Sequence, residues 1–154
     1  MMNRRHFLKA SSACAALLAC PKRVQAGAGS RKIPVGIQLY SFREQAKVDF
    51  TVTLKKAAEI GFSGVEFAGY GPFAEKPAEL RKILDGYGLK AFGTHTGFNL
   101  VQPEALKKTM DFHATIGCKY IIIPWIDPKV LATKEACLKT AEQLSKISET
   151  VQKE

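Results

Sequence analysis

The sequence predicts an α/β fold in which short parallel strands alternate with helices, and two observations support this prediction. Apolar, strand-like runs begin near Val35, Gly64, Lys90 and Lys119, at separations of 29, 26 and 29 residues. Each gap between them holds a helical pattern of apolar residues that ends at a glycine. This spacing leaves room for one crossover helix per unit, as parallel strands require. We therefore expect four consecutive βα units in one sheet.

The predicted helix boundaries share a small set of signals. Glycine ends the first three helices, where a left-handed residue is common, at Gly61, Gly88 and Gly117. Two helices can begin with proline, whose missing N–H costs nothing in the first turn, and the other two have capping side chains. These starting residues are Pro77 and Pro103, and the caps are Asp49 and Thr133.

The helical segments are amphipathic. Leu80, Leu84 and Tyr87 follow the spacing of one helix face, whereas lysine pairs such as Lys55–Lys56 are expected in water. The formal net charge of +9 is not a nucleic-acid signal, because five of the 23 basic residues lie in residues 1–26, which contain no acid. The remaining 18 basic and 14 acidic residues give an ordinary solvated surface. We expect no nucleic-acid partner.

The fourth strand-like run, residues 120–125, is apolar on both faces. Such a strand is expected to be buried, covered by helices on one side and by core on the other. Four right-handed βα units can form an open, doubly wound sheet or half of a closed barrel, and periodicity alone does not choose between the two.

Polar residues on the strands indicate where a site would lie. Gln38 and Tyr40 share one face of the first strand, Glu66 lies late in the second, and His95 ends the third on the same face as Ala91 and Gly93. In a parallel barrel, functional residues gather at the carboxyl ends of the strands. We therefore expect these polar groups to meet at one rim.

Each of these residues also has a structural interpretation. Glu66 can be paired with a buried cation, and His95 can be satisfied by backbone groups. Gln38 and Tyr40 can be wall or core hydrogen-bonders. Arg43, in the first βα connection, can bind a phosphate or hydroxyl group or be a surface residue. His113 lies on a helix stripe and is expected to pack in the core.

Three ordered motifs carry a resemblance to a known family. They are the run Val35–Arg43, the run Leu54–Glu66 with its Ile60-Gly61-Phe62 turn, and Gly88-Leu89 leading to His95. Together they resemble the xylose isomerase-like TIM barrels, over nearly all of residues 33–154. The resemblance implies a (β/α)8 TIM-barrel type fold of which only the first four βα units are present, a half-barrel. The family includes sugar isomerases, sugar-phosphate epimerases, dehydratases and an abasic-site endonuclease branch.

The resemblance also implies a chemistry. A divalent metal (Mg, Mn or Zn) would polarise a sugar carbonyl while a carboxylate moves a proton between carbons. The expected substrate-binding residues are Gln38, Tyr40, Arg43, Glu66 and His95. The metal ligands of the family come mainly from the later strands, so this chain would lack most of them. The endonuclease branch is disfavoured, because Pro124-Trp125 replaces the histidine expected on the fourth strand.

Two functional hypotheses follow. The first is a sugar or sugar-phosphate isomerase or epimerase, present as an incomplete copy that is inactive by itself. The second is a non-catalytic interaction module, because a half-barrel leaves strand edges and an apolar interior open. Such a module would pair with a second half or with itself as a homo-oligomer.

The amino-terminal residues predict an export signal. Arg4 and Arg5 precede Phe7-Leu8-Lys9, the apolar run 13–19 and the small-residue site Val24-Gln25-Ala26. This order is typical of a cleaved signal peptide, and the run is shorter than the roughly 20 residues of a membrane span. The paired arginines resemble a twin-arginine export signal.

The chain is accordingly divided into a signal peptide (1–26), a linker (27–32) and the half-barrel (33–154). We expect an exported, periplasmic or otherwise extracytoplasmic protein. Leu17-Leu18-Ala19-Cys20 is similar to a lipoprotein cleavage box. Cleavage after Ala26 and lipid anchoring at Cys20 both stay open.

Overall fold

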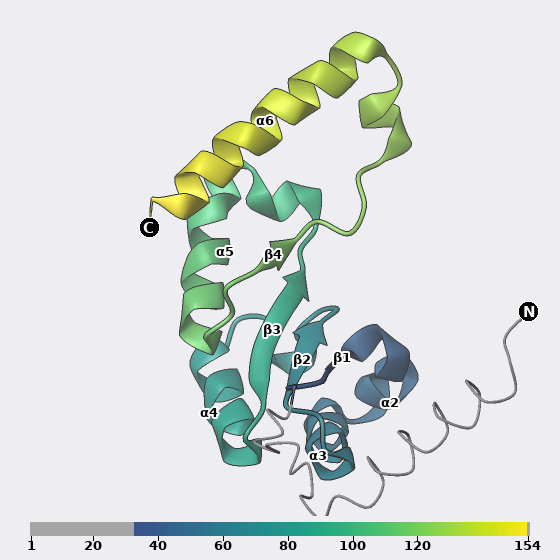
Figure 1. The fold of residues 1–154 in the computed structure, drawn as a ribbon, viewed down its shortest axis with the longest axis vertical. Coiled ribbons are helices and arrows are strands. Elements are labelled where there is room, and N and C mark those ends of the chain that lie inside the picture. Colours follow the sequence, from purple (N-terminus) through teal and green to yellow (C-terminus); the bar gives the residue numbers. More distant parts are fainter. Residues whose placement is uncertain (1–32, 154) are drawn as a thin grey trace, which may run out of the picture. The chain divides into compact units, whose positions relative to one another are not determined.

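The computed structural model of the chain describes residues 33–153 (Figure 1). Four parallel strands form one sheet in the order β1-β2-β3-β4. The strands are β1 (Gly36–Gln38), β2 (Gly64–Phe67), β3 (Lys90–His95) and β4 (Ile121–Ile122). The helices are α2 (Arg43–Val48), α3 (Phe50–Ile60), α4 (Pro77–Tyr87), α5 (Pro103–Ile116) and α6 (Lys134–Gln152). The predicted α/β class and parallel sheet are confirmed, whereas the predictions for the signal peptide and linker lie outside the described residues.

The helix boundaries confirm the sequence signals. Asp49 Oδ1 accepts a hydrogen bond from the backbone N–H of Val52 at 2.8 Å at the start of α3, and Thr133 caps α6 in the same way. Pro77 and Pro103 open α4 and α5. The three terminal glycines have φ values in the left-handed region, namely 105° at Gly61, 67° at Gly88 and 73° at Gly117.

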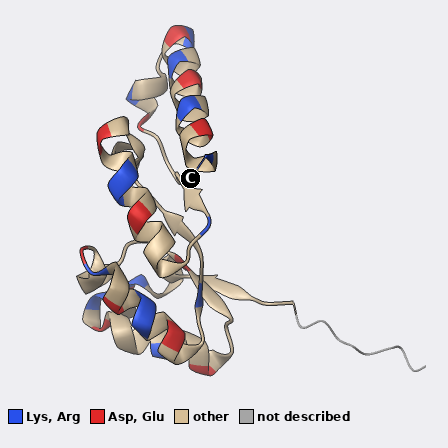
Figure 2. Ribbon diagram, turned by 90° about the vertical axis from the view of Figure 1, so that its left-hand side faces the viewer, with Lys and Arg blue, Asp and Glu red and all other residues tan. Residues whose placement is uncertain are grey.

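The hydrophobic core lies between the sheet and the helices that cover one of its faces. Leu54 of α3, Leu80 of α4 and the β2 residues Val65 and Phe67 are completely buried. Burying each of these side chains contributes about 1.5–3 kcal/mol. Lysines and acids alternate on the outer surfaces of the helices (Figure 2). Lysines and acidic residues pair across one helix turn, as Lys107 and Asp111 do at 2.9 Å. The lysine pairs of the helices are therefore interspersed with acidic groups and form no separate basic patch on this surface.

A bulge between β2 and β3 changes which residues of β3 face the open side of the sheet. Val65 pairs with Ala91 but Glu66 pairs with Gly93, so β3 carries one extra residue, Phe92. The expectation that Ala91 shares a face with His95 is therefore wrong, because Ala91 lies in the hydrophobic core on the helix side. A bulge inserts one residue and so reverses the alternation of side chains.

Phe92 lies on the open face of the sheet, over two glycines that occupy the same register of β1 and β2. Gly36 pairs with Gly64, and a Cβ atom on Gly64 would lie 2.9 Å from Cζ of Phe92. A Cβ atom on Gly36 would collide with the same ring. These two positions therefore need glycine because a phenyl ring takes the space of their side chains.

The fourth strand differs from its prediction. Only Ile121 and Ile122 form β4, and Tyr120 and Trp125 are 67% and 65% exposed, so the expectation that residues 120–125 are buried is wrong. Within residues 33–153, β4 pairs only with β3. Among these residues there is also no helix with the length and apolar character needed to cross a membrane.

Candidate functional site

Three polar side chains converge at the carboxyl ends of the first three strands. Gln38 ends β1 and stands opposite Glu66 of β2 in the register, while His95 ends β3 two residues after Gly93, the partner of Glu66. Gln38 Nε2 donates to Glu66 Oε1 at 3.0 Å and lies 2.9 Å from His95 Nε2. His95 Nε2 is 3.0 Å from Glu66 Oε1. We call these three residues the Gln38–Glu66–His95 cluster.

The hydrogens available cannot satisfy all three of these contacts at once. The Gln38 amide only donates through Nε2, an ionised Glu66 only accepts, and His95 Nε2 either carries a proton or offers a lone pair. If Nε2 carries the proton, it donates to Glu66 and faces another donor on Gln38. If it does not, it accepts from Gln38 and faces the carboxylate acceptor. A hydroxyl group, which donates and accepts, is suited to complete such a cluster.

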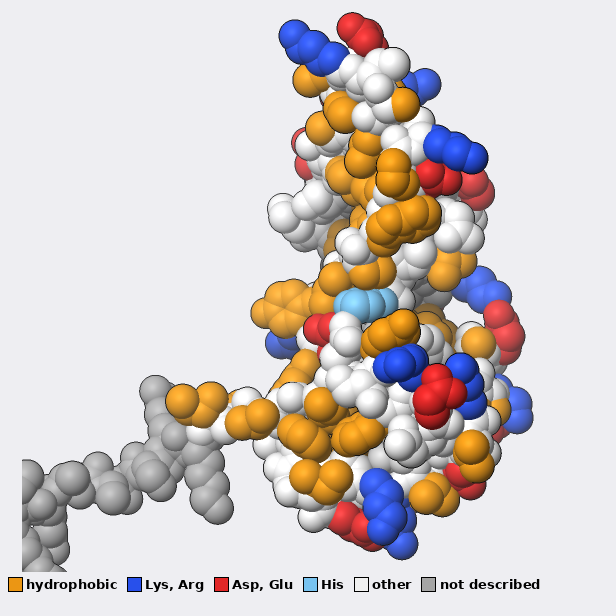
Figure 3. All heavy atoms as spheres, turned by 90° about the vertical axis from the view of Figure 1, so that its right-hand side faces the viewer, with side chains coloured by type: hydrophobic (Ala, Val, Ile, Leu, Met, Phe, Trp, Pro, Cys, Tyr) orange, Lys and Arg blue, Asp and Glu red, His pale blue; other side chains and the backbone are white. Residues whose placement is uncertain are grey.

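The cluster is partly open to solvent. The side chains of Glu66 and His95 are 31% and 27% exposed. Viewed from the side away from α4 and α5, the molecule shows a surface where apolar side chains gather with a histidine among them (Figure 3). Polar groups next to apolar surface are the usual composition of a pocket for a small polar molecule.

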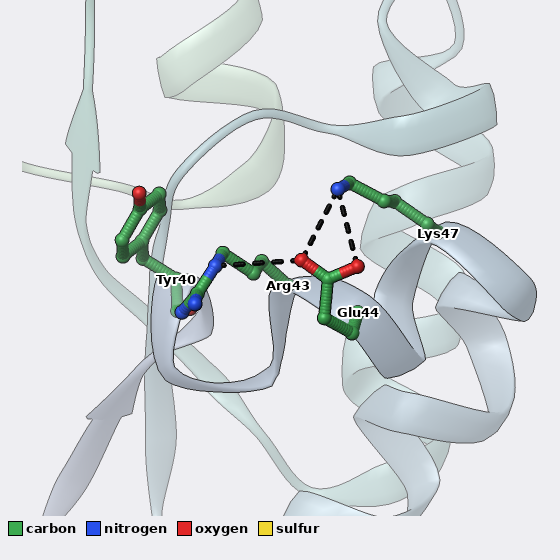
Figure 4. A network of polar contacts seen from close by, with 4 residues as sticks. All are labelled: Tyr40, Arg43, Glu44 and Lys47. Atoms are coloured by element: carbon green, nitrogen blue, oxygen red, sulfur yellow. Dashed lines mark hydrogen bonds and ion pairs between the residues drawn. The ribbon is translucent and has the colours of Figure 1, made fainter.

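Tyr40 and Arg43, the other predicted site residues, do not join the cluster. β1 ends at Gln38 and residues Leu39–Phe42 form a 3₁₀ turn, so the expectation that Gln38 and Tyr40 share a strand face is wrong. Tyr40 is 58% exposed, and the Arg43 guanidinium lies over its ring at 4.7 Å from the centroid. Figure 4 shows this pair together with Glu44 and Lys47.

His113 of α5 is buried, as predicted, but in a polar network behind the sheet. Its Nδ1 lies 2.6 Å from the carbonyl oxygen of Thr109, so this nitrogen donates and Nε2 accepts. Nε2 contacts the hydroxyl of Thr94 and that of Tyr70 at 3.2 Å. Burial lowers the pKa of His113, although the Thr109 hydrogen bond opposes the shift. Thr94 precedes His95 directly, so the network anchors the strand that presents His95.

The described residues do not fit a complete metal centre. Between residues 33 and 153 no group of three or more His, Cys, Asp or Glu side chains is arranged to hold a metal ion. Glu66 and His95 offer one carboxylate and one imidazole, fewer protein ligands than the three or four of a Zn²⁺ site. At the end of β4, where the endonuclease branch would have a histidine, the chain has Pro124-Trp125.

Two residues near the predicted site residues were not predicted from the sequence. Phe92 packs against Gly36 and Gly64, which lie two residues before Gln38 and Glu66, and Lys47 lies beside Arg43 and Glu44. Phe92 is hidden by the bulge, yet the two glycines at matching positions of β1 and β2 are a signal that a large side chain crosses them. Lys47 belongs to α2, a short helix within the first connection. The four-residue spacing between Arg43 and Lys47 is the sequence signal for Lys47, because residues at this spacing lie on the same face of a helix.

Comparisons with known proteins agree with the fold and the export signal. Residues 1–19 match the family of twin-arginine translocation (TAT) pathway signal sequences. Among solved structures, a sugar phosphate isomerase/epimerase from Parabacteroides distasonis is similar to this chain, with 20% sequence identity and a TM-score of 0.59. The similarity covers 80% of this chain and 50% of that protein, so this chain spans about half its length. No curated protein matches the sequence significantly. The chain thus combines a twin-arginine export signal with a fold that corresponds to half of a TIM barrel.

Proposed function

We propose that the protein acts in the isomerisation or epimerisation of a sugar or sugar phosphate, and that its described residues form the sugar-binding rim. The observation that supports this is the convergence of Gln38, Glu66 and His95 at the carboxyl ends of adjacent strands. Functional groups of TIM barrels gather at this end. The likeness to a sugar phosphate isomerase/epimerase supports the same kind of activity.

Each residue of the cluster has a defined task in this proposal. Gln38 donates to a sugar oxygen, Glu66 accepts from a hydroxyl, and His95 does either, according to whether Nε2 carries a proton. A sugar that binds there supplies the donor and acceptor that the three side chains cannot supply to one another. Their joint effect is to hold neighbouring sugar oxygens in one orientation, which aligns the carbons that exchange a proton.

Sugar binding tests the proposal directly. We expect the full chain to give saturation-transfer NMR signals with D-xylose or D-fructose. Glu66→Gln and His95→Asn should each weaken sugar binding about tenfold, because each variant removes one hydrogen bond to the sugar.

The matched control is Glu149→Gln, which changes an exposed carboxylate on α6 and should leave binding unchanged. Circular dichroism checks that each variant keeps its fold. Absence of binding by the wild type, or equal binding by Glu66→Gln and the wild type, would refute the role of the cluster.

A second candidate function is an interaction module that pairs with itself or with another half-barrel. The exposure of Tyr120 and Trp125 favours it, since large exposed aromatic side chains are enriched in interfaces. Light scattering after size exclusion tests it. A dimer that Trp125→Ala converts to monomer supports the module, and a monomeric wild type refutes self-pairing.

The compartment is the third part of the proposal. The TAT signal supports export, and we propose that the mature protein resides in the periplasm or another extracytoplasmic space. Mass spectrometry of the exported protein distinguishes cleavage after Ala26 from a lipid anchor at Cys20. A cytoplasmic, uncleaved protein would contradict the assignment.

A further inference from the structure

A cavity with two cationic side chains in an otherwise largely apolar lining lies beside the Gln38–Glu66–His95 cluster, between the first βα connection and the loop after β2. Its volume is about 440 Å³. Tyr40, Arg43 and Lys47 line one side, and Gly69 and Gly71 line the other. We call it the Arg43 groove. Because it starts at Tyr40, two residues beyond Gln38, its edge is no more than about 7 Å along the chain from the cluster.

Two cations of the groove share one carboxylate. Arg43 Nε lies 3.5 Å from Glu44 Oε1, and Lys47 Nζ lies 3.2 Å from the same oxygen. Figure 4 shows the carboxylate of Glu44 between the two cationic groups. The three side chains carry a net charge of +1. They are 50–70% exposed, and ion pairs at such exposure contribute about 0–1 kcal/mol, so a ligand with more negative charge can replace Glu44.

The guanidinium of Arg43 is held in place before any ligand arrives. It stacks on the Tyr40 ring, and Nη1 donates to the backbone oxygen of Tyr40 at 3.2 Å. Of its five N–H donors, only Nη1 makes a hydrogen bond to another described residue. A guanidinium fixed in this way loses little side-chain entropy on binding an anion, and its planar fork matches the oxygens of a phosphate.

The opposite side of the groove presents backbone rather than side chains. Gly69 has a φ of 116°, a conformation that side-chain-bearing residues rarely adopt. No other atom lies within 4 Å of the place where its Cβ would be. Buried Leu39 and Phe50 form apolar walls, and low-dielectric walls strengthen the attraction between the cations and an anion.

We propose that the Arg43 groove binds the phosphate group of a sugar phosphate whose sugar part occupies the Gln38–Glu66–His95 cluster. This inference rests on the proposed function and specifies its substrate class. A phosphate monoester carries a charge of about −1.5 to −2 at pH 7, more than the single charge of Glu44. Phosphate therefore displaces Glu44 from the two cations, whereas a neutral sugar cannot.

The first experiment uses inorganic phosphate as the probe. Calorimetric titration of the full chain at constant ionic strength should show binding that Arg43→Met and Lys47→Met each weaken about tenfold. Glu44→Gln should tighten it about threefold, because it removes a competing ion pair.

Helix α3 offers matched controls. Glu59 pairs with Lys55 at 3.8 Å and with Lys56 at 3.2 Å, a similarly exposed trio that lines no part of the Arg43 groove. Lys56→Met and Glu59→Gln should leave phosphate binding unchanged. If these controls alter binding as much as Arg43→Met and Glu44→Gln do, or if Arg43→Met binds phosphate normally, the groove is not the site.

The second experiment separates this inference from the proposed function. D-fructose 6-phosphate should bind more tightly than D-fructose, and Arg43→Met should abolish the difference while leaving D-fructose binding unchanged. Glu66→Gln should weaken both ligands. Equal affinities for the two ligands would overturn the phosphate site and leave the sugar site standing. Binding of inorganic phosphate through Arg43 without binding of either sugar would overturn the proposed function and the link to a sugar.

Discussion

The side-chain amide of Gln38 lies 3.0 Å from Oε1 of Glu66, and the two residues stand opposite one another in the pairing of β1 with β2. The contact is thus fixed by the register of the sheet and needs no loop to form it. Sites carried by regular elements hold their geometry more closely than sites carried by loops. The rim at this point is preorganised, whereas Tyr40 and Arg43 sit on the connection that follows β1.

A double-mutant cycle with Gln38→Ala and Glu66→Ala should give a coupling free energy of about 1 kcal/mol in urea unfolding, as for a partly exposed hydrogen bond to a charged group. The exposed pair Glu44 and Lys47 is the control and should give about 0.3–0.5 kcal/mol. Coupling no larger than that of the control pair would mean that the cluster adds no stability beyond a surface contact.

The space occupied by Phe92 predicts an unequal rescue of two glycine variants. Gly36→Ala and Gly64→Ala should each destabilise the fold by about 1–3 kcal/mol through overpacking. A Cβ on Gly36 would collide with the Phe92 ring and lie 3.2 Å from the backbone oxygen of Gly64, a tight contact but not a collision. A Cβ on Gly64 would collide with both the Phe92 ring and the backbone oxygen of Lys90. Phe92→Ala should therefore relieve Gly36→Ala and leave most of the cost of Gly64→Ala, as measured by urea midpoints relative to Phe92→Ala alone. Equal rescue of both glycine variants is the contrary result.

Local signals made the helices predictable from the sequence, and long-range pairing made part of the site unpredictable. The cap at Asp49 and the terminal glycine at Gly61 depend on neighbours within one turn, so their residue types suffice. The meeting of Glu66 with His95 follows from parallel strand order.

The face of Ala91 depends on a bulge, and the exposure of Trp125 depends on which elements lie beside β4. Neither is encoded in a local pattern. The prediction that Tyr40 shares a strand face with Gln38 is wrong because β1 has only three residues. Tyr40 lies beyond its end, where side chains no longer alternate between the two faces of a sheet.

The folded protein should become less stable in mild acid because of the buried His113. Burial lowers its pKa in the folded state, so between the folded and unfolded pKa values the unfolded chain binds more protons. Stability is full above the unfolded pKa of about 6.5 and falls as the pH drops below it, by at most about 1.4 kcal/mol per pH unit. Urea unfolding from about pH 8 to about pH 5 should show this slope in the wild type. His113→Gln should lose part of it, and an unchanged slope in His113→Gln would contradict the assignment.

The two cysteines of the described residues should differ in reactivity. Cys118 is buried and Cys137 is exposed. Burial raises the pKa of the Cys118 thiol, against a smaller opposing effect of its hydrogen bond to the Tyr120 carbonyl, and only the thiolate attacks an alkylating reagent. Iodoacetamide labelling followed by peptide mass spectrometry, which reads each cysteine separately, should modify Cys137 quickly. Cys118 should react slowly until urea opens the core, because it is 7% exposed and belongs to the hydrophobic core. Equal labelling of both in native buffer would mean that the core around Cys118 opens readily.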